Sequence, residues 1–149
     1  MKVSFTTKEY ARLLELAFIG QSVVDGRMET DEKRSARYDE LLQKIFSLAA
    51  AHGCAELVED DGEALNPSRA LEAGPAAAIL DKYVDEAFWS ELAERLALRD
   101  LRATQGVRPA QGELTEAEIR QLDELSEGYW KEFEKHGVDH VQVLRGGHG

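Results

Sequence analysis

The chain has 149 residues, the length of one ordinary domain, and its 43% hydrophobic and 32% charged residues are typical of a globular protein. The 29 acidic and 18 basic side chains give a formal net charge of −11. Binding to a phosphate backbone requires a basic patch, and the longest basic-leaning stretch, Lys33–Arg37, lies between acidic pairs. Composition therefore excludes a nucleic-acid partner and predicts a single domain over residues 1–149.

Cys54 is the only cysteine, so one chain can form neither an internal disulfide nor a multi-cysteine zinc site. The N-terminus lacks the uncharged apolar stretch of a signal peptide, because Lys8, Glu9 and Arg12 interrupt it. No run approaches the roughly 20 apolar residues that span a bilayer. We therefore expect a cytoplasmic protein with no membrane partner.

The first helix is predicted to run from Thr7 to Val24 and to end near Gly26. Thr6 and Glu9 form the pattern of a capping box, in which the threonine hydroxyl and the glutamate carboxylate each accept from the backbone amide of the other residue. Apolar residues cover more than one stripe of this helix. That pattern indicates either a central place in a bundle or a subunit interface.

The middle of the chain is predicted to hold three further helices. The second begins after Thr30 and ends at His52-Gly53, where glycine can adopt the left-handed conformation. A short third helix begins at Asn66-Pro67, with asparagine as the cap and proline in the first helical position. Gly74-Pro75 interrupts it, and a long helix follows over Ala76–Thr104.

The last helix is expected over Glu116–His136, because Thr115–Glu118 repeats the capping-box pattern. Two short β-prone segments, Cys54–Val58 and Val138–Leu144, follow the two His-Gly helix ends. We expect them to pair with each other, since a lone strand leaves its backbone groups unsatisfied. The prediction is an all-α fold, a four-to-five-helix bundle with a minor two-stranded β element, in which residues 145–149 form a frayed tail.

Residues near the two His-Gly ends give the most specific prediction of a metal site. His136 and His140 have the spacing of zinc ligands on one helix face, but Gly137 lies between them and is expected to end the helix. If the two ends meet in space, three nitrogen ligands and one sulfur ligand come together. The four metal candidates are His52, Cys54, His136 and His140. The competing interpretation is that the histidines stabilise helix ends and the cysteine is a small buried side chain.

No catalytic pattern accompanies these residues. A di-iron bundle needs Glu-x-x-His pairs, and no glutamate stands three residues before a histidine. The acidic loop Glu59–Gly62 has its glycine in the wrong place for an EF-hand. Helical nucleotide pyrophosphatases combine Glu-x-x-Glu, present at 91–94 and 124–127, with Glu-x-x-Asp, which the chain lacks. Serine-hydrolase and phosphate-binding glycine motifs are missing too, so we expect no catalysis and assign no cofactor.

Two adjacent aromatic pairs point to a binding function instead. Phe88-Trp89 and Tyr129-Trp130 lie on the longest predicted helices. Neighbours on a helix point about 100° apart, so both members of a pair are buried only within a wide apolar arc. Trp89, Trp130 and, on the first helix, Phe18 are therefore the predicted anchors of a protein interface.

The leading hypothesis is a small regulatory or interaction module without catalysis, which forms a homo-oligomer or binds another protein. The alternative is a metal-binding protein or metal-dependent enzyme that uses the His-Gly ends. A third hypothesis is an acidic protein that occupies the nucleic-acid site of a basic partner. The segments around Phe88–Leu101 and Thr115–Val143 resemble bacterial proteins, and this resemblance implies no known activity.

Overall fold

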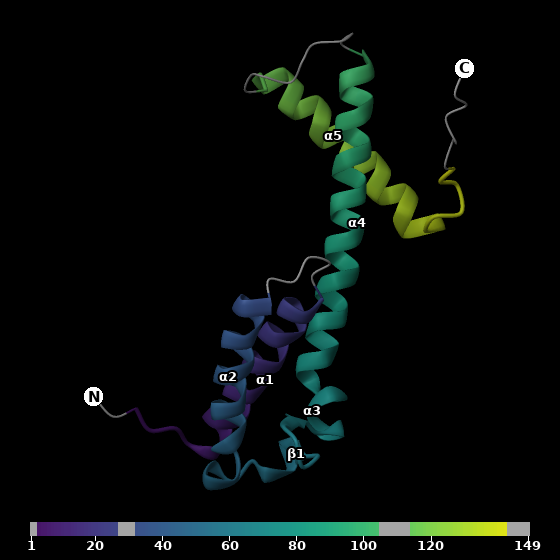
Figure 1. Ribbon diagram of the computed structural model, residues 1–149. Helices are drawn as coiled ribbons and strands as arrows, with labels where there is room; N and C mark the ends of the chain where they lie inside the picture. Colours follow the sequence, from purple (N-terminus) through teal and green to yellow (C-terminus); the bar gives the residue numbers. More distant parts are fainter. Residues whose placement is uncertain (1–2, 27–31, 105–113, 143–149) are drawn as a thin grey trace, which may run out of the picture. The chain divides into compact units, whose positions relative to one another are not determined.

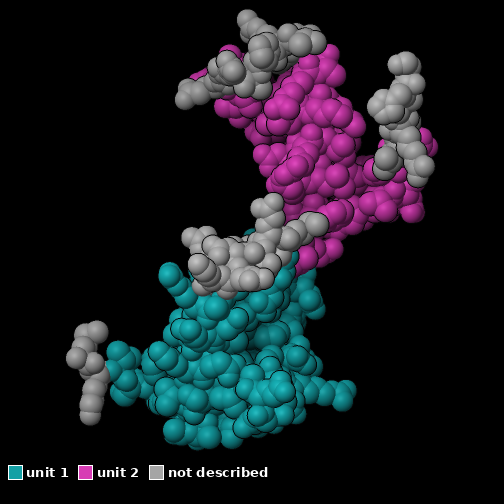
Figure 2. Space-filling view, viewed as in Figure 1, with its two compact units in different colours: residues 1–83 teal, residues 84–149 magenta. Residues whose placement is uncertain are grey.

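The computed structural model describes residues 3–26, 32–104 and 114–142. Within these ranges it contains five α-helices and one two-stranded antiparallel sheet, which confirms the all-α fold with a minor β element. The chain divides into two compact units, residues 1–83 and 84–149 (Figure 2). The expectation of one domain stays a prediction, because compact units are defined by contacts and domains by independent folding.

Figure 1 shows the elements in chain order. The helices are α1 (Thr7–Asp25), α2 (Glu32–Ser47), α3 (Arg69–Glu72), α4 (Pro75–Thr104) and α5 (Glu116–His136). The strands are β1 (Val58–Asp60) and β2 (Leu65–Pro67), and two 3-10 turns, η1 (Ala50–His52) and η2 (Ala55–Leu57), lie between α2 and β1. The predicted bounds of the first and last helices are confirmed to within one residue.

Both capping boxes are formed. At the start of α1 the amide of Glu9 donates to the hydroxyl of Thr6 (3.3 Å), and the amide of Thr6 donates to the carboxylate of Glu9 (2.8 Å). These bonds from Thr6, its backbone amide first, lower the pKa of Glu9. The same reciprocal pair of bonds begins α5. Each box satisfies backbone groups that a helix start otherwise leaves without partners.

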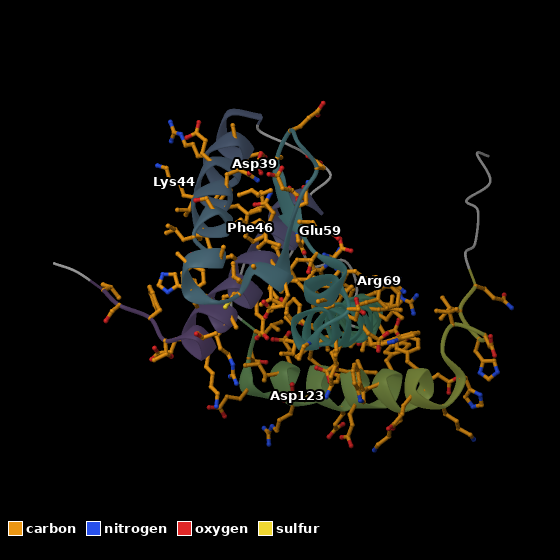
Figure 3. The ribbon with its side chains drawn as sticks, turned by 90° about the horizontal axis from the view of Figure 1, so that it is seen from below. Asp39, Lys44, Phe46, Glu59, Arg69 and Asp123 are labelled. Carbon is orange, nitrogen blue, oxygen red and sulfur yellow. The ribbon has the colours of Figure 1, made fainter. Side chains whose placement is uncertain are left out.

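The core of the first unit lies where α1 and α2 run side by side (Figure 1). The hydroxyl of Tyr10 crosses it and donates to the carbonyl of Ile45 (2.7 Å). Figure 3 shows Phe46 on the inner side of α2 and Lys44 on the side that faces solvent. The buried members of this core are Tyr10, Leu14, Phe46, Ala49, Cys54 and Leu71.

The prediction for the first β segment was wrong in both position and partner. Most of Cys54–Val58 lies in the 3-10 turn η2, and the strand begins only at Val58. Val58–Asp60 pairs antiparallel with Leu65–Pro67, so the sheet is a local hairpin. Its turn is closed by Asp61, whose carboxylate accepts from the amides of Glu63 and Ala64 (both 2.9 Å). Residues 138–142 form a turn and irregular chain rather than a strand, while 143 and 144 lie outside the described residues. A hairpin satisfies the backbone groups of both strands with a far shorter loop than pairing with Val138–Leu144 would need. The loss of loop entropy is smaller, so the local pairing is favoured.

The predicted start of the short helix was also wrong. Asn66-Pro67 belongs to β2, and α3 begins after Ser68. The amide of Asn66 donates to Asp61 in the hairpin turn (2.8 Å), so it is not available as a cap. The buried hydroxyl of Ser68 donates to the carbonyl of Glu56 (2.6 Å) and ties α3 to η2. Tertiary bonds therefore override the local cap pattern.

The other helix limits follow the sequence more closely. The break at Gly74-Pro75 is confirmed, because α3 ends before it and α4 begins at Pro75. The second helix ends at Ser47 rather than at His52. The 3-10 turn η1 follows it and ends at Gly53, which adopts the expected left-handed conformation (φ 73°). The predicted cap Thr30 lies outside the described residues.

In the second unit, α5 crosses the later part of α4 (Figure 1). The small residues Ala93 and Ala97 are fully buried on α4, and such residues allow a close approach between helices. Phe133 of α5 is buried and lies against the ring of Trp89 (centroids 5.4 Å apart). Among the described helices of both units, none has a stretch long and apolar enough to cross a membrane.

The capping box of α1 gives a stability prediction. We expect Thr6→Ala to lower the free energy of unfolding by about 1 kcal/mol, because the amide of Glu9 loses its acceptor. Thr6→Ser keeps the hydroxyl and should stay within a few tenths of a kcal/mol of the parent. Urea denaturation followed by circular dichroism measures both. Equal losses in the two variants would contradict the role of the hydroxyl.

Candidate functional site

Of the four predicted metal ligands, Cys54 lies in the core of the first unit and the half-buried His52 packs against that core. The ring of His52 stacks on Tyr10 with centroids 4.0 Å apart and planes 7° from parallel. Cys54 is 1% exposed, and its thiol donates to the carbonyl of Thr7 (3.4 Å). Burial first, and the nearby charge of Glu56 second, raise the pKa of the Cys54 thiol. Both side chains thus have structural contacts of their own, as the competing interpretation expects.

His136 and His140, the other two, lie together in the second unit. As predicted, α5 ends at His136. A turn over residues 137–140 then reverses the chain, and the two imidazole rings come within 4.4 Å of each other, centroid to centroid. Gly137 makes this turn possible, because its backbone has a positive φ of 56°. The helix therefore ends where expected, yet the histidines still meet.

Glu132 completes this group and was missed from the sequence. One of its carboxylate oxygens lies 2.5 Å from Nδ1 of His140. One candidate ligand atom from each of Glu132, His136 and His140 lies within 4.8 Å of the others, and we call these three residues the histidine cluster. The signal was present, since Glu132 stands four residues before His136 and thus on the same helix face. The Glu-x-x-His pattern of di-iron bundles does not include it, because that pattern has a spacing of three.

The four-residue metal site stays a prediction. His52 and Cys54 belong to the first unit, whereas His136 and His140 belong to the second. His136 and His140 have the carboxylate of Glu132 as a neighbour within the second unit.

Two of the three predicted interface anchors line one hollow of the second unit. Trp89 and Trp130 face a cavity of about 270 Å³, which we call the tryptophan hollow. Its full lining is Asp85, Glu86, Trp89, Trp130, Phe133 and Glu134. The indole nitrogen of Trp89 donates to Asp85 (3.1 Å), and Trp130 is 40% exposed. The hollow thus combines aromatic walls with acidic side chains.

Phe18, the third predicted anchor, has a different setting. It is half-buried, packs against the core of the first unit, and lines a cleft of about 440 Å³ beside α2 and β2. In the same cleft the amide of Gln21 donates to both Asp25 (2.9 Å) and Asp39 (2.7 Å). These carboxylates are therefore already engaged. Phe18 contributes more to the core than to an exposed surface.

Exposed apolar side chains of the first unit lie elsewhere on α1 and α2. Leu16 and Val23 are exposed on α1, and Tyr38 and Leu41 are exposed on α2. Between the two helices lies a shallow, almost wholly apolar hollow of about 140 Å³, lined in part by Gly20, Tyr38 and Leu41. We call Leu16, Gly20, Val23, Tyr38 and Leu41 the α1–α2 face.

No family model matches the chain, and neither a curated protein nor a solved structure matches it significantly. Support for a function therefore comes from the residues of the chain itself.

The hydroxyl of Tyr129 links α5 to α4 one turn before the histidine cluster. It donates to the carboxylate of Asp100 and accepts from the guanidinium of Arg99 (3.0 Å). Hydrogen bonds from Arg99 first, and from Tyr129 second, lower the pKa of Asp100. The carboxylate thus stabilises the fold above its unfolded pKa of about 3.9, and this contribution is lost as the pH falls through the lower folded value.

Tyr129→Phe should consequently lower the free energy of unfolding by about 1 kcal/mol at pH 7. The difference from the parent should shrink as the pH falls from about 4, the unfolded pKa of an aspartate, through the lower folded pKa of Asp100. Urea denaturation across this pH range measures the effect. Tyr83→Phe, at an exposed tyrosine, is the control and should change stability by less than about 0.5 kcal/mol. A pH-independent difference for Tyr129→Phe would contradict the role of Asp100.

Proposed function

We propose that this protein is a non-catalytic interaction module that self-associates through the α1–α2 face. The observation that supports the proposal is the exposure of large apolar side chains on both helices of one pair: Leu16 is 67% and Leu41 is 56% exposed. Fully burying such a side chain contributes roughly 1.5–3 kcal/mol. Contiguous apolar patches on soluble proteins commonly mark interaction sites.

A second copy of the chain is the partner that fits this face best. In a two-fold symmetric dimer the same patch meets itself, so it must hold both projections and hollows. The face has both, because Leu16 and Leu41 project and a hollow lies beside Gly20. Two antiparallel helix pairs that pack in this way form a four-helix bundle, a common arrangement.

Gly20 supports the same arrangement. Glycine inside a helix lowers helix stability by about 1 kcal/mol relative to alanine. A glycine at such a position therefore needs a structural explanation. A Cβ built at Gly20 meets no atom of the described residues within 4 Å, so packing within the described part of the chain does not explain the glycine. A partner helix that approaches closely at this position would explain it.

The test of self-association is Leu41→Glu. We expect the parent chain to be dimeric at micromolar concentration. The variant should associate at least about tenfold more weakly, since a charge replaces a leucine that the proposed dimer would bury. Sedimentation equilibrium over a concentration series measures both. Ile119→Glu, which changes an exposed apolar residue of α5, is the matched control and should dimerise as the parent does.

Gly20→Ala extends the same experiment. The added methyl group has open space in the single chain, so it should stabilise α1 by up to about 1 kcal/mol. It should at the same time weaken the dimer, because it separates the two copies of α1. A parent chain that stays monomeric at high micromolar concentration contradicts the proposal, and so does a dimer that Leu41→Glu leaves unchanged.

The tryptophan hollow favours a second candidate function, the binding of an arginine side chain from a basic segment of another protein. A guanidinium stacks well on indole rings, with an attraction of about 0.5–2 kcal/mol. The lining is acidic, although Asp85 also accepts from the indole of Trp89, and its negative charge and the net charge of −11 complement a cation. This chemistry agrees with the expectation that an acidic chain attracts a basic partner.

Intrinsic fluorescence tests this candidate directly, because the only two tryptophans of the chain both line the hollow. A basic arginine-containing peptide should change the emission on titration, and the same peptide with glutamine in place of arginine should not. Trp130→Ala should weaken binding by about fivefold, the lower part of the cation–π range. Ile119→Ala on α5 is the control. Equal responses to the two peptides would contradict arginine recognition.

A further inference from the structure

The histidine cluster contains a ligand set that is familiar from zinc proteins. Two imidazoles and one carboxylate hold Zn²⁺ in many proteins, and they leave a fourth position open. Here Glu132 and His136 come from the last turns of α5, and His140 comes from the turn that follows. No sulfur ligand is required, and all three residues belong to the second unit.

We propose that Glu132, His136 and His140 bind one Zn²⁺ ion per chain. Three ligand atoms held at about 2.1 Å by a tetrahedral ion lie about 3.4 Å from one another. The candidate atoms of the cluster lie within 4.8 Å of one another, and Glu132 and His140 are in contact at 2.5 Å, so shifts of about an ångström, which shorten the longest separation and lengthen this contact, complete the set. Side-chain rotation suffices for such a change, because the side chains of Glu132 and His140 are 42% and 61% exposed.

The backbone holds the three residues in place before any ion binds. Glu132 and His136 are separated by one helical turn, so their side chains emerge on the same face of α5. Gly137 allows the sharp turn that returns His140, and the amide of Gly137 donates to the carbonyl of Phe133 (2.8 Å). A site prearranged in this way loses less conformational entropy when the ion binds.

Glu132 and His140, which contact each other in the free chain, would both bind the ion in this site. In the free chain the carboxylate and the imidazole hold each other, with Oε1 and Nδ1 2.5 Å apart. Zn²⁺ binds a neutral imidazole and an ionised carboxylate, so two bonds to the ion would take the place of this direct contact. The strongly negative net charge of the chain also favours a divalent cation over an anion.

Isothermal titration of the full chain with Zn²⁺ tests the proposal. We expect saturable binding with a stoichiometry of one. His136→Ala and His140→Ala should each weaken binding by at least about tenfold, because even the loss of a residue that only supports a zinc ligand costs about 10–100-fold. Glu132→Gln should weaken it as well, since it removes the charge with little change in shape. Circular dichroism of each variant shows that α5 is still formed.

Three control variants separate this site from the other metal-binding side chains of the molecule. Glu134→Gln changes a neighbouring carboxylate of α5 and should bind as the parent does. His148→Ala removes the remaining histidine that follows α5 and should also leave the affinity unchanged. Cys54→Ser tests the alternative site that draws on His52 and Cys54, and the three-residue site predicts unchanged affinity for it. With Co²⁺ as the probe, the near-ultraviolet charge-transfer band of thiolate ligands should be absent.

Specific outcomes overturn the proposal. They are the absence of saturable Zn²⁺ binding, an affinity that His136→Ala and His140→Ala leave unchanged, and an affinity that falls with Cys54→Ser. Leu41→Glu should bind Zn²⁺ as the parent does, so a failure of self-association and a failure of metal binding are distinguishable. A loss of Zn²⁺ binding in Leu41→Glu would show that the ion requires two chains and would overturn the single-chain site.

Discussion

The bond from the hydroxyl of Tyr10 to the carbonyl of Ile45 fixes the rotation of α1 against α2, and much of the first unit follows from it. Tyr10 is 2% exposed and also supports the ring of His52, which positions the chain just after α2. Since side chains repeat every 3.6 residues, turning Tyr10 and Leu14 inward turns Leu16 outward. The part of the α1–α2 face that α1 supplies thus lies on the side of this helix that faces away from the core.

The parts of the fold that the sequence predicts well are those decided by neighbouring residues. The capping boxes at Thr6 and Thr115 require only four residues in a row, and both helices begin as expected. Asn66-Pro67 is an equally local pattern, but the prediction from it was wrong. The side chain of Asn66 bonds to Asp61 in the hairpin turn, and Ser68 is the residue that precedes α3. That outcome depends on residues brought together by folding, which a local pattern does not contain.

The candidate sites show the same division. The residue types and spacing of His136, His140, Trp89 and Trp130 were enough to single them out. Glu132 was missed, although its spacing of four residues before His136 places it on the same helix face. Glu132 and His140 meet only because a glycine reverses the chain after α5, and the tryptophan hollow exists only because α5 crosses α4 beside Ala93. Residue type thus indicates where a site lies. The geometry of one turn or one helix crossing determines which other side chains belong to it.

The burial of Cys54 has a practical consequence for work on this chain. Its thiol is enclosed by the core and held by the carbonyl of Thr7, and the rise in its pKa keeps the reactive thiolate scarce. Alkylating reagents and mild oxidants should therefore pass over the native protein. A cysteine introduced on the exposed side of α5 would become the selective attachment point for a dye or a spin label, with no need to remove Cys54 first.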